Sequence, residues 1–195
     1  MNPLPELILA STSPYRRQLL ERLRLPFRAI APQVDEAHRS GEAAAERAAR
    51  LALAKAEAVS AQYPGAVVIG SDQVALCEGV VLDKPGTAAT AVAQLHRLSG
   101  RSAVFHSAVA VVHRNSARQD CFTHLTEVRF RTLSSGEIER YVAADAPLDC
   151  AGSFRSEALG SALFEAVLSD DPTGLVGLPL IRLASSLRVM GYALP

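Results

Sequence analysis

The sequence predicts a single α/β domain over residues 1–195, with a mixed β-sheet flanked by helices. Three observations support this prediction. The chain has 195 residues and is 49% hydrophobic, which is enough for one buried core. Helical and strand-like patterns alternate along it, as is typical of helices packed on a sheet. The middle of the chain instead carries two long strand-like segments in succession, which indicates a hairpin and therefore a sheet that is not wholly parallel.

The first elements are predicted to be a strand, a helix and a second strand. The apolar run Leu7–Ala10 predicts a buried strand that meets a Ser-Thr-Ser-Pro turn. Ser13 suits a helix N-cap and Pro14 suits the first helical turn, and leucines then recur at helical spacing. Residues Phe27–Ile30 predict the second strand.

The next segment contains the strongest strand pattern of the chain. An alanine-rich stretch over Glu42–Tyr63 predicts a long helix. The run Ala66–Gly70 predicts a buried strand that leads directly into Ser71-Asp72-Gln73. Residues Val80–Leu82 predict a short strand, and a turn follows at Asp83-Lys84-Pro85.

The rest of the chain predicts a hairpin and three further helices. Ser134 suits an N-cap, and Glu137 completes a capping box three residues later. In chain order, the predicted elements are a helix over Thr87–Leu98, antiparallel strands over Val104–His113 and Leu125–Arg131 joined by a polar connection, the helix capped by Ser134, a strand over Leu163–Leu168 and a helix over Leu180–Met190.

The composition excludes several classes of protein. Twenty basic and twenty acidic residues give a formal net charge of +0, whereas a nucleic-acid polymer binder normally carries a basic excess. No apolar run is long enough to span a bilayer, and the N-terminus has no secretory-signal pattern. Three widely spaced cysteines form no CxxC pair. We therefore expect a cytoplasmic protein that binds neither a membrane nor a nucleic-acid polymer.

The basic residues are almost all arginines. Only two of the twenty, Lys55 and Lys84, are lysines. A lineage bias toward arginine would replace lysine wherever the two are interchangeable, so the two survivors are candidates for sites that need a compact ammonium group. The alternative is that both lysines are ordinary solvated charges, on a helix and in a turn.

The first predicted helix begins with groups that suit an anion. Ser11 and Ser13 place hydroxyls at its N-terminus, and Arg16 and Arg17 follow. Free backbone N–H groups, the helix dipole and arginine side chains all favour a phosphate there. The alternative is an ordinary capped helix with solvated arginines.

Two groups of carboxylates follow predicted strands. Asp72 comes after the buried strand over Ala66–Gly70, and Asp35 and Glu36 come after the second strand. Carboxylate oxygens suit magnesium or manganese, which bridge to phosphate oxygens. Turn chemistry is the alternative reading for each carboxylate taken singly. Together with the anion site and the lysines, however, they predict phosphoryl or nucleotidyl transfer.

Several motifs in this order resemble the Maf family of nucleotide pyrophosphatases. They are LILASTSPYRRQLL, APQVDE, ALAKA, IGSDQV, DKP, CAGSFRSE and LVGLPL. The resemblance runs over nearly the whole chain, roughly from Leu7 to Gly191, and CAGSFRSE is similar to the YceF-like branch. The resemblance implies a fold like that of inosine triphosphate pyrophosphatases. It also implies that six residues bind phosphate or take part in catalysis: Ser11, Arg16, Glu36, Lys55, Asp72 and Lys84.

The resemblance further implies a chemistry and an assembly. A nucleoside triphosphate would be cleaved between its α and β phosphates, with a divalent cation (Mg²⁺, Mn²⁺ or Co²⁺) held by Glu36 and Asp72. Asp72 would orient or deprotonate the attacking water, or hold the cation. The family is cytoplasmic and often homodimeric. A nucleotide-binding regulator of septum formation and cell division is a rival reading.

Three positions bear on the choice of base by the same resemblance: Tyr15, Gln73 and Glu157. The branch is associated with 7-methyl-GTP, whose purine ring is positively charged. Tyr15 would stack on that ring, and Glu157 would accept from its N–H edge. Two departures from the branch stand out, because Tyr15 replaces a tryptophan and Asp83 replaces a glycine. A dTTP and UTP pyrophosphatase is the alternative within the family.

Overall fold

The computed structural model describes residues 4–195. The strands are β1 (Leu7–Ala10), β2 (Arg28–Ile30), β3 (Val67–Cys77), β4 (Val80–Val81), β5 (Ser102–His113), β6 (Arg118–Phe130) and β7 (Phe164–Leu168). The helices are α1 (Pro14–Glu21), α2 (Ala44–Ser60), α3 (Ala88–Leu98), α4 (Ser135–Asp145) and α5 (Leu180–Val189). None of the helices within residues 4–195 is both long and apolar enough to cross a membrane.

The strands form one mixed sheet, as predicted. Their order is β2-β1-β3-β5-β6-β7, and β4 pairs with β3 outside this path. Strand β1 pairs in parallel with β2 and β3, whereas β4 and β7 pair antiparallel with their neighbours. The prediction of an α/β fold with a mixed sheet is therefore confirmed.

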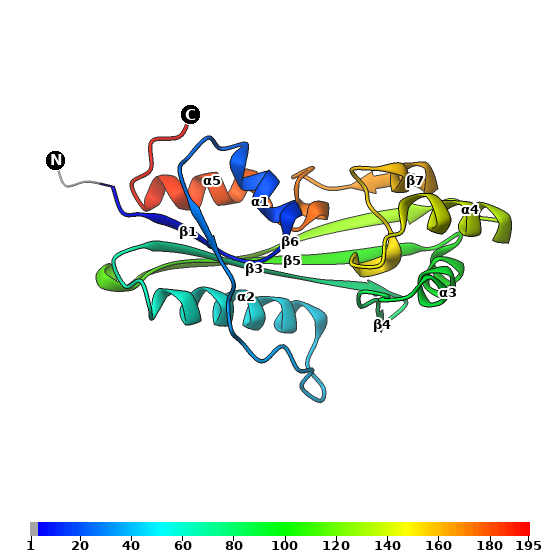
Figure 1. The fold of residues 1–195 in the computed structure, drawn as a ribbon, viewed down its shortest axis with the longest axis horizontal. Coiled ribbons are helices and arrows are strands. Elements are labelled where there is room, and N and C mark those ends of the chain that lie inside the picture. The colour runs from blue at the N-terminus through cyan, green and yellow to red at the C-terminus, as the bar shows by residue number, and fades with distance from the viewer. Residues whose placement is uncertain (1–3) are drawn as a thin grey trace. The chain divides into compact units, whose positions relative to one another are not determined.

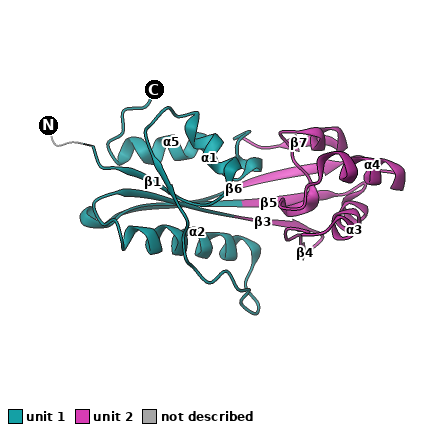
Figure 2. Ribbon diagram, viewed as in Figure 1, with its two compact units in different colours: residues 1–72, 107–124, 171–195 teal, residues 73–106, 125–170 magenta. Residues whose placement is uncertain are grey.

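The chain divides into two compact units (Figure 2). Unit 1 comprises Met1–Asp72, Ser107–His124 and Asp171–Pro195, and unit 2 comprises Gln73–His106 and Leu125–Asp170. Strands β3, β5 and β6 each contribute residues to both units. The expectation of a single domain over residues 1–195 stays a prediction.

Unit 1 has helices on both faces of its strands, with α1 and α5 on one face and α2 on the other (Figure 1). Because side chains alternate along a strand, successive residues of β1 and β3 point to opposite faces. Leu7, Leu9 and Ile69 belong to the apolar core that includes the leucines of α1 and α5. Gly70, one residue further along β3, approaches the backbone of α2 instead.

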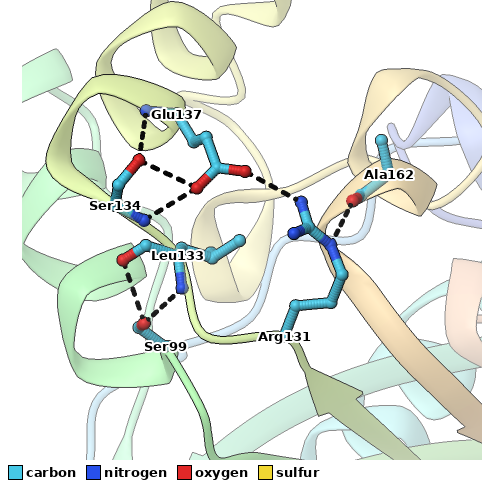
Figure 3. A network of polar contacts seen from close by, with 6 residues as sticks. All are labelled: Ser99, Arg131, Leu133, Ser134, Glu137 and Ala162. Atoms are coloured by element: carbon cyan, nitrogen blue, oxygen red, sulfur yellow. Dashed lines mark hydrogen bonds and ion pairs between the residues drawn. The ribbon is translucent and has the colours of Figure 1, made fainter.

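Unit 2 is organised around aromatic rings and a capped helix. Four phenylalanines pack edge to face with centroids 4.9 to 5.4 Å apart: Phe105, Phe130, Phe154 and Phe164. The predicted capping box at α4 is present, because the Glu137 amide donates to Ser134 Oγ and the Ser134 amide donates to Glu137 Oε2 (Figure 3). Arg131 also pairs with the Glu137 carboxylate at 3.3 Å.

Two strands are longer than the sequence predicts by several residues. Strand β3 continues to Cys77, so Ser71-Asp72-Gln73 lies inside the strand and the expectation that Asp72 follows the strand is wrong. Strand β6 begins at Arg118 and not at Leu125. Both extensions are rich in polar residues, which conceal the apolar pattern on which a strand prediction depends.

Candidate active site

A buried ammonium group lies between two carboxylates in unit 1. Lys55 is only 6% exposed, on the face of α2 that packs against the sheet. Its Nζ lies 2.6 Å from Asp72 Oδ1 and 2.8 Å from Glu36 Oε1. Asp72 is itself buried, whereas the Glu36 side chain is 58% exposed. A buried charge requires such partners, and the exposed carboxylate leaves one side of the cluster open to solvent.

A glycine allows this cluster to form. A Cβ atom at Gly70 would lie 2.1 Å from the carbonyl oxygen of Ala52 and 2.6 Å from the amide nitrogen of Ala56. Strand β3 and helix α2 therefore approach more closely than any side chain at position 70 would permit. Lys55 lies between those two alanines in α2, and Asp72 lies two residues after Gly70 on the same face of β3.

Arg16 is held by two backbone carbonyls. Its Nε donates to the Gly177 carbonyl at 3.1 Å, and its Nη1 donates to the Ser71 carbonyl at 2.9 Å. Burial lowers the pKa of the Arg16 guanidinium, while the negative charges of Asp72 and Glu36 oppose that shift. The two carbonyls fix the plane of the guanidinium, whose other N–H groups can recognise a phosphate.

The Gly177 carbonyl accepts hydrogen bonds from two side chains, which the sequence did not reveal. Ser71 Oγ also donates to it, at 2.8 Å, from the face of β3 opposite Asp72. The backbone of Gly177 has a φ of 103°, a conformation that favours glycine. The LVGLPL motif therefore contributes a backbone acceptor and has no polar side chain, so that a search for chemically active side chains could not find it.

Buried Asp171 fixes the loop that carries Gly177. Its Oδ1 accepts from the Thr173 amide at 2.9 Å, and its Oδ2 accepts from the Ile181 amide at 2.7 Å at the start of α5. Thr173 Oγ1 in turn accepts from the Leu180 amide. The signal for this role was present in the sequence as an Asp-Pro-Thr turn ahead of a helix, but turn residues of this kind are common.

Ser11 lies at the beginning of the predicted anion site. It is buried, and its Oγ accepts from the Ser13 amide at 3.1 Å. Ser13 caps α1 as predicted, since its Oγ accepts from the Arg16 amide at 3.4 Å. A hydroxyl that accepts one hydrogen bond can also donate one, so Ser11 Oγ can donate to an anion.

The segment that carries Glu36 is held to α2 by Arg50. The Arg50 guanidinium pairs with the Glu42 carboxylate, with Nη2 2.6 Å from Oε2, and also donates to the Ala37 carbonyl at 3.3 Å. The hydrogen bond from Arg50 lowers the pKa of Glu42. Arg50 was not among the predicted site residues, because one arginine among eighteen gives no signal of its own.

The remaining predicted residues lie elsewhere along the chain. Tyr15 is half-buried in α1 of unit 1. In unit 2, Gln73 is half-buried in β3, Lys84 is exposed in the turn between β4 and α3, and Glu157 is exposed with its carboxylate accepting from Ser156 Oγ. The roles assigned to these four residues stay predictions.

The two carboxylates at Lys55 suit a hard divalent cation. Glu36 Oε1 and Asp72 Oδ1 converge on one ammonium nitrogen. Magnesium is usually held by one or two carboxylates together with waters and substrate phosphates. Within residues 4–195, no cluster of three or more His, Cys, Asp or Glu side chains could hold a metal by itself. The Glu36 and Asp72 carboxylates offer oxygen ligands of the kind that Mg²⁺ accepts beside waters and phosphates.

We expect Lys55→Arg and Lys84→Arg each to lower kcat/KM for the predicted nucleotide hydrolysis about tenfold, although each substitution retains the charge. A planar guanidinium is larger than an ammonium, and at position 55 it would have to fit between two carboxylates that already contact Nζ. Steady-state kinetics of the purified variants would measure the effect, with the exposed exchange Arg97→Lys as control. Wild-type kcat/KM in both lysine variants would contradict the argument from composition.

Comparison with known proteins adds a family match. The model of the family described as "Maf-like protein" matches residues 6–190. A protein of Xanthomonas oryzae named "7-methyl-GTP pyrophosphatase" is 56% identical, and the alignment covers 98% of this chain and 100% of the relative. A protein of the same name from Pseudomonas aeruginosa is 50% identical, with the same shares covered.

Solved structures resemble the fold at low sequence identity. The Ham1 protein of Staphylococcus aureus aligns with a TM-score of 0.54 at 15% identity, and covers 94% of this chain and 99% of its own. A HAM1 protein from Coxiella burnetii aligns with a TM-score of 0.52 at 19% identity, over 95% of this chain and 100% of its own. At such identities the likeness establishes the fold alone.

Proposed function

Because the chain belongs to the Maf-like protein family, we propose that it hydrolyses 7-methyl-GTP to 7-methyl-GMP and pyrophosphate. The observation that carries this proposal is the buried Lys55 ammonium between Asp72 and Glu36. It is supported by relatives that align over nearly their whole length and are named "7-methyl-GTP pyrophosphatase". The Lys55 ammonium can neutralise the negative charge of a phosphoric anhydride, and the carboxylates can activate the water that attacks it.

The reaction forms a bond from a water oxygen to the α-phosphorus and breaks the bond from that phosphorus to the bridging oxygen. Asp72 takes the proton of the water or orients the water, or else it helps to hold the cation. A divalent cation held by Glu36 and Asp72 would neutralise phosphate charge when bound. Arg16, Lys55 and Lys84 neutralise the triphosphate and the leaving pyrophosphate, and Ser11 donates a hydrogen bond to a phosphate oxygen.

The base is selected by three further side chains in this proposal. Tyr15 stacks on the cationic purine ring and gains a cation–π contribution. Glu157 accepts from the N–H edge of the guanine, and Gln73 can donate or accept a hydrogen bond. We also propose a cytoplasmic homodimer that folds as a single domain over residues 1–195.

We expect kcat/KM for 7-methyl-GTP to exceed that for GTP about tenfold and to exceed those for dTTP and UTP by more. The two purine nucleotides share a triphosphate, so only the methyl group and its positive charge distinguish them. A desolvated cation–π contact is worth about 2 kcal/mol, and even part of this, held through the transition state, gives a tenfold difference. Pyrophosphate release under matched cation and pH would measure each value.

The residues responsible are tested in the same assay. Tyr15→Ala and Glu157→Gln should each narrow the difference between the methylated and plain nucleotides, whereas Glu165→Gln, an exposed carboxylate of β7, should not. Equal kcat/KM for 7-methyl-GTP and GTP, or a preference for dTTP, would overturn the proposed substrate. Nucleotide binding without any pyrophosphate release would point to a regulator and not to an enzyme.

A further inference from the structure

The amide of Gln94 makes two contacts within unit 2. Gln94 lies in α3, and its Nε2 donates to the Asp83 carbonyl at 2.9 Å. Its Oε1 accepts from Ser153 Oγ at 2.6 Å. One side chain therefore joins the turn before α3 to a segment about sixty residues later in the chain.

The first contact holds the turn that carries Lys84. Asp83 directly precedes Lys84, so a hydrogen bond to the Asp83 carbonyl fixes the peptide plane next to the lysine. On the other side of the lysine, the Gly86 amide donates to the Leu148 carbonyl at 3.0 Å. Gly86 has a φ of 67°, which completes the turn. The backbone at Lys84 is thus held on both sides.

The second contact holds a strained residue at the base of the loop that carries Glu157. Ser153 is fully buried and has a φ of 62°, which is uncommon for a residue other than glycine. Such a conformation persists only where its surroundings hold it, and the bond to Gln94 is one such restraint.

The loop beyond Ser153 is held by contacts at both of its ends. Phe154 packs among the aromatic rings of unit 2, and the Arg155 amide donates to the Tyr141 hydroxyl at 3.0 Å. A Cβ atom at Gly160 would lie 2.3 Å from the Arg155 carbonyl oxygen, so the two ends of the loop pack directly against each other. These contacts would carry a displacement of Ser153 toward Glu157, which lies between Arg155 and Gly160.

We propose that Gln94 is a positioning residue that links the phosphate contact of Lys84 to the selection of the base by Glu157. This proposal rests on the proposed function, in which Lys84 meets the triphosphate and Glu157 meets the base. A glutamine suits the role because one amide supplies both a donor and an acceptor. An ionised glutamate at position 94 can accept a hydrogen bond but cannot donate one, and leucine can neither accept nor donate. Substitutions can therefore separate the contact with Asp83 from the contact with Ser153.

The test compares Gln94→Glu, Gln94→Leu and Ser153→Ala by steady-state kinetics with 7-methyl-GTP and GTP, alongside thermal unfolding. Gln94→Glu keeps the acceptor for Ser153 and loses the donor to Asp83, so KM should rise for both nucleotides, on the order of threefold to tenfold, with the preference retained. Ser153→Ala should reduce the preference for 7-methyl-GTP by a similar factor while KM for GTP changes little. Gln94→Leu should show both effects. The control, His96→Glu, adds a negative charge on the exposed surface of α3 and should show neither.

The inference fails if folded Gln94→Leu retains the wild-type KM and preference, or if His96→Glu reproduces the changes. It also fails if the variants lower kcat for both nucleotides equally with KM and preference unchanged, because that pattern indicates a general loss of folded enzyme. The absence of any preference in the wild type would instead contradict the proposed substrate. In that case, the effect of Gln94→Glu on KM for GTP would still test whether Gln94 positions Lys84.

Discussion

Replacement of Asp72 by asparagine should lower kcat by about 10²–10⁴-fold, the range that general-base catalysis contributes. Asparagine has nearly the same shape and can still accept a hydrogen bond from Lys55. It cannot take a proton from water, and as a neutral ligand it holds a cation more weakly than a carboxylate does. Glu36, whose Oε1 lies 2.8 Å from Lys55 Nζ, still offers the ammonium an anionic partner. We therefore expect activity to fall far more than stability.

A matched control separates catalysis from the loss of an ion pair. Asp120 in β6 is also a paired aspartate of unit 1, because its Oδ2 lies 3.1 Å from Arg182 and accepts from Ser186 Oγ at 2.6 Å. Asp120→Asn should leave kcat unchanged. Both variants would be compared by pyrophosphate release with added Mg²⁺ and by thermal unfolding. Near-normal turnover of a folded Asp72→Asn enzyme would show that catalysis does not require the Asp72 carboxylate.

The sequence predicted the fold because its elements are strongly patterned. The runs Leu7–Ala10 and Ala66–Gly70 are almost entirely apolar, as strands buried on both faces must be, and both are strands in the structure. The extension of β3 through Ser71 and Asp72 was missed, because polar residues inside a buried strand resemble a turn that follows it. The structure shows that the alternation simply continues, with Asp72 toward α2 and Ser71 toward the opposite face.

The candidate site could be predicted where it consists of side chains that are scarce or that stand at the end of a predicted element. Scarcity singled out Lys55, and the structure places its ammonium between two carboxylates. The same argument singled out Lys84, which lies exposed in a turn, so its role continues to rest on the family resemblance. Carbonyl groups such as that of Gly177 carry no compositional signal. Their place in the site depends on contacts between segments far apart in the chain, which periodicity cannot reveal.

Gly70 should be as indispensable to unit 1 as any polar residue of the site. An alanine Cβ at this position would lie 2.1 Å from a backbone oxygen of α2, which cannot rotate away as a flexible side chain could. Strand and helix would have to separate, and we expect Gly70→Ala to cost about 3 kcal/mol of the free energy of unfolding, at the upper end for overpacked cores. For a chain of this size the loss corresponds to a decrease in Tm of roughly 6–12 °C.

The same separation should lower activity, because Lys55 lies on α2 between the residues that Gly70 touches. A displacement near 1 Å at a catalytic group can cost about 10²-fold in rate, so kcat of the folded variant should fall by a factor of that order. Gly65→Ala is the matched control, since its Cβ would lie 3.6 Å from Asn115 Nδ2, an ordinary contact. Thermal unfolding and kinetics of both variants, measured well below the Tm, would test the prediction. If Gly70→Ala matched Gly65→Ala in both measurements, the close approach of β3 to α2 would not be what holds Lys55 beside Asp72.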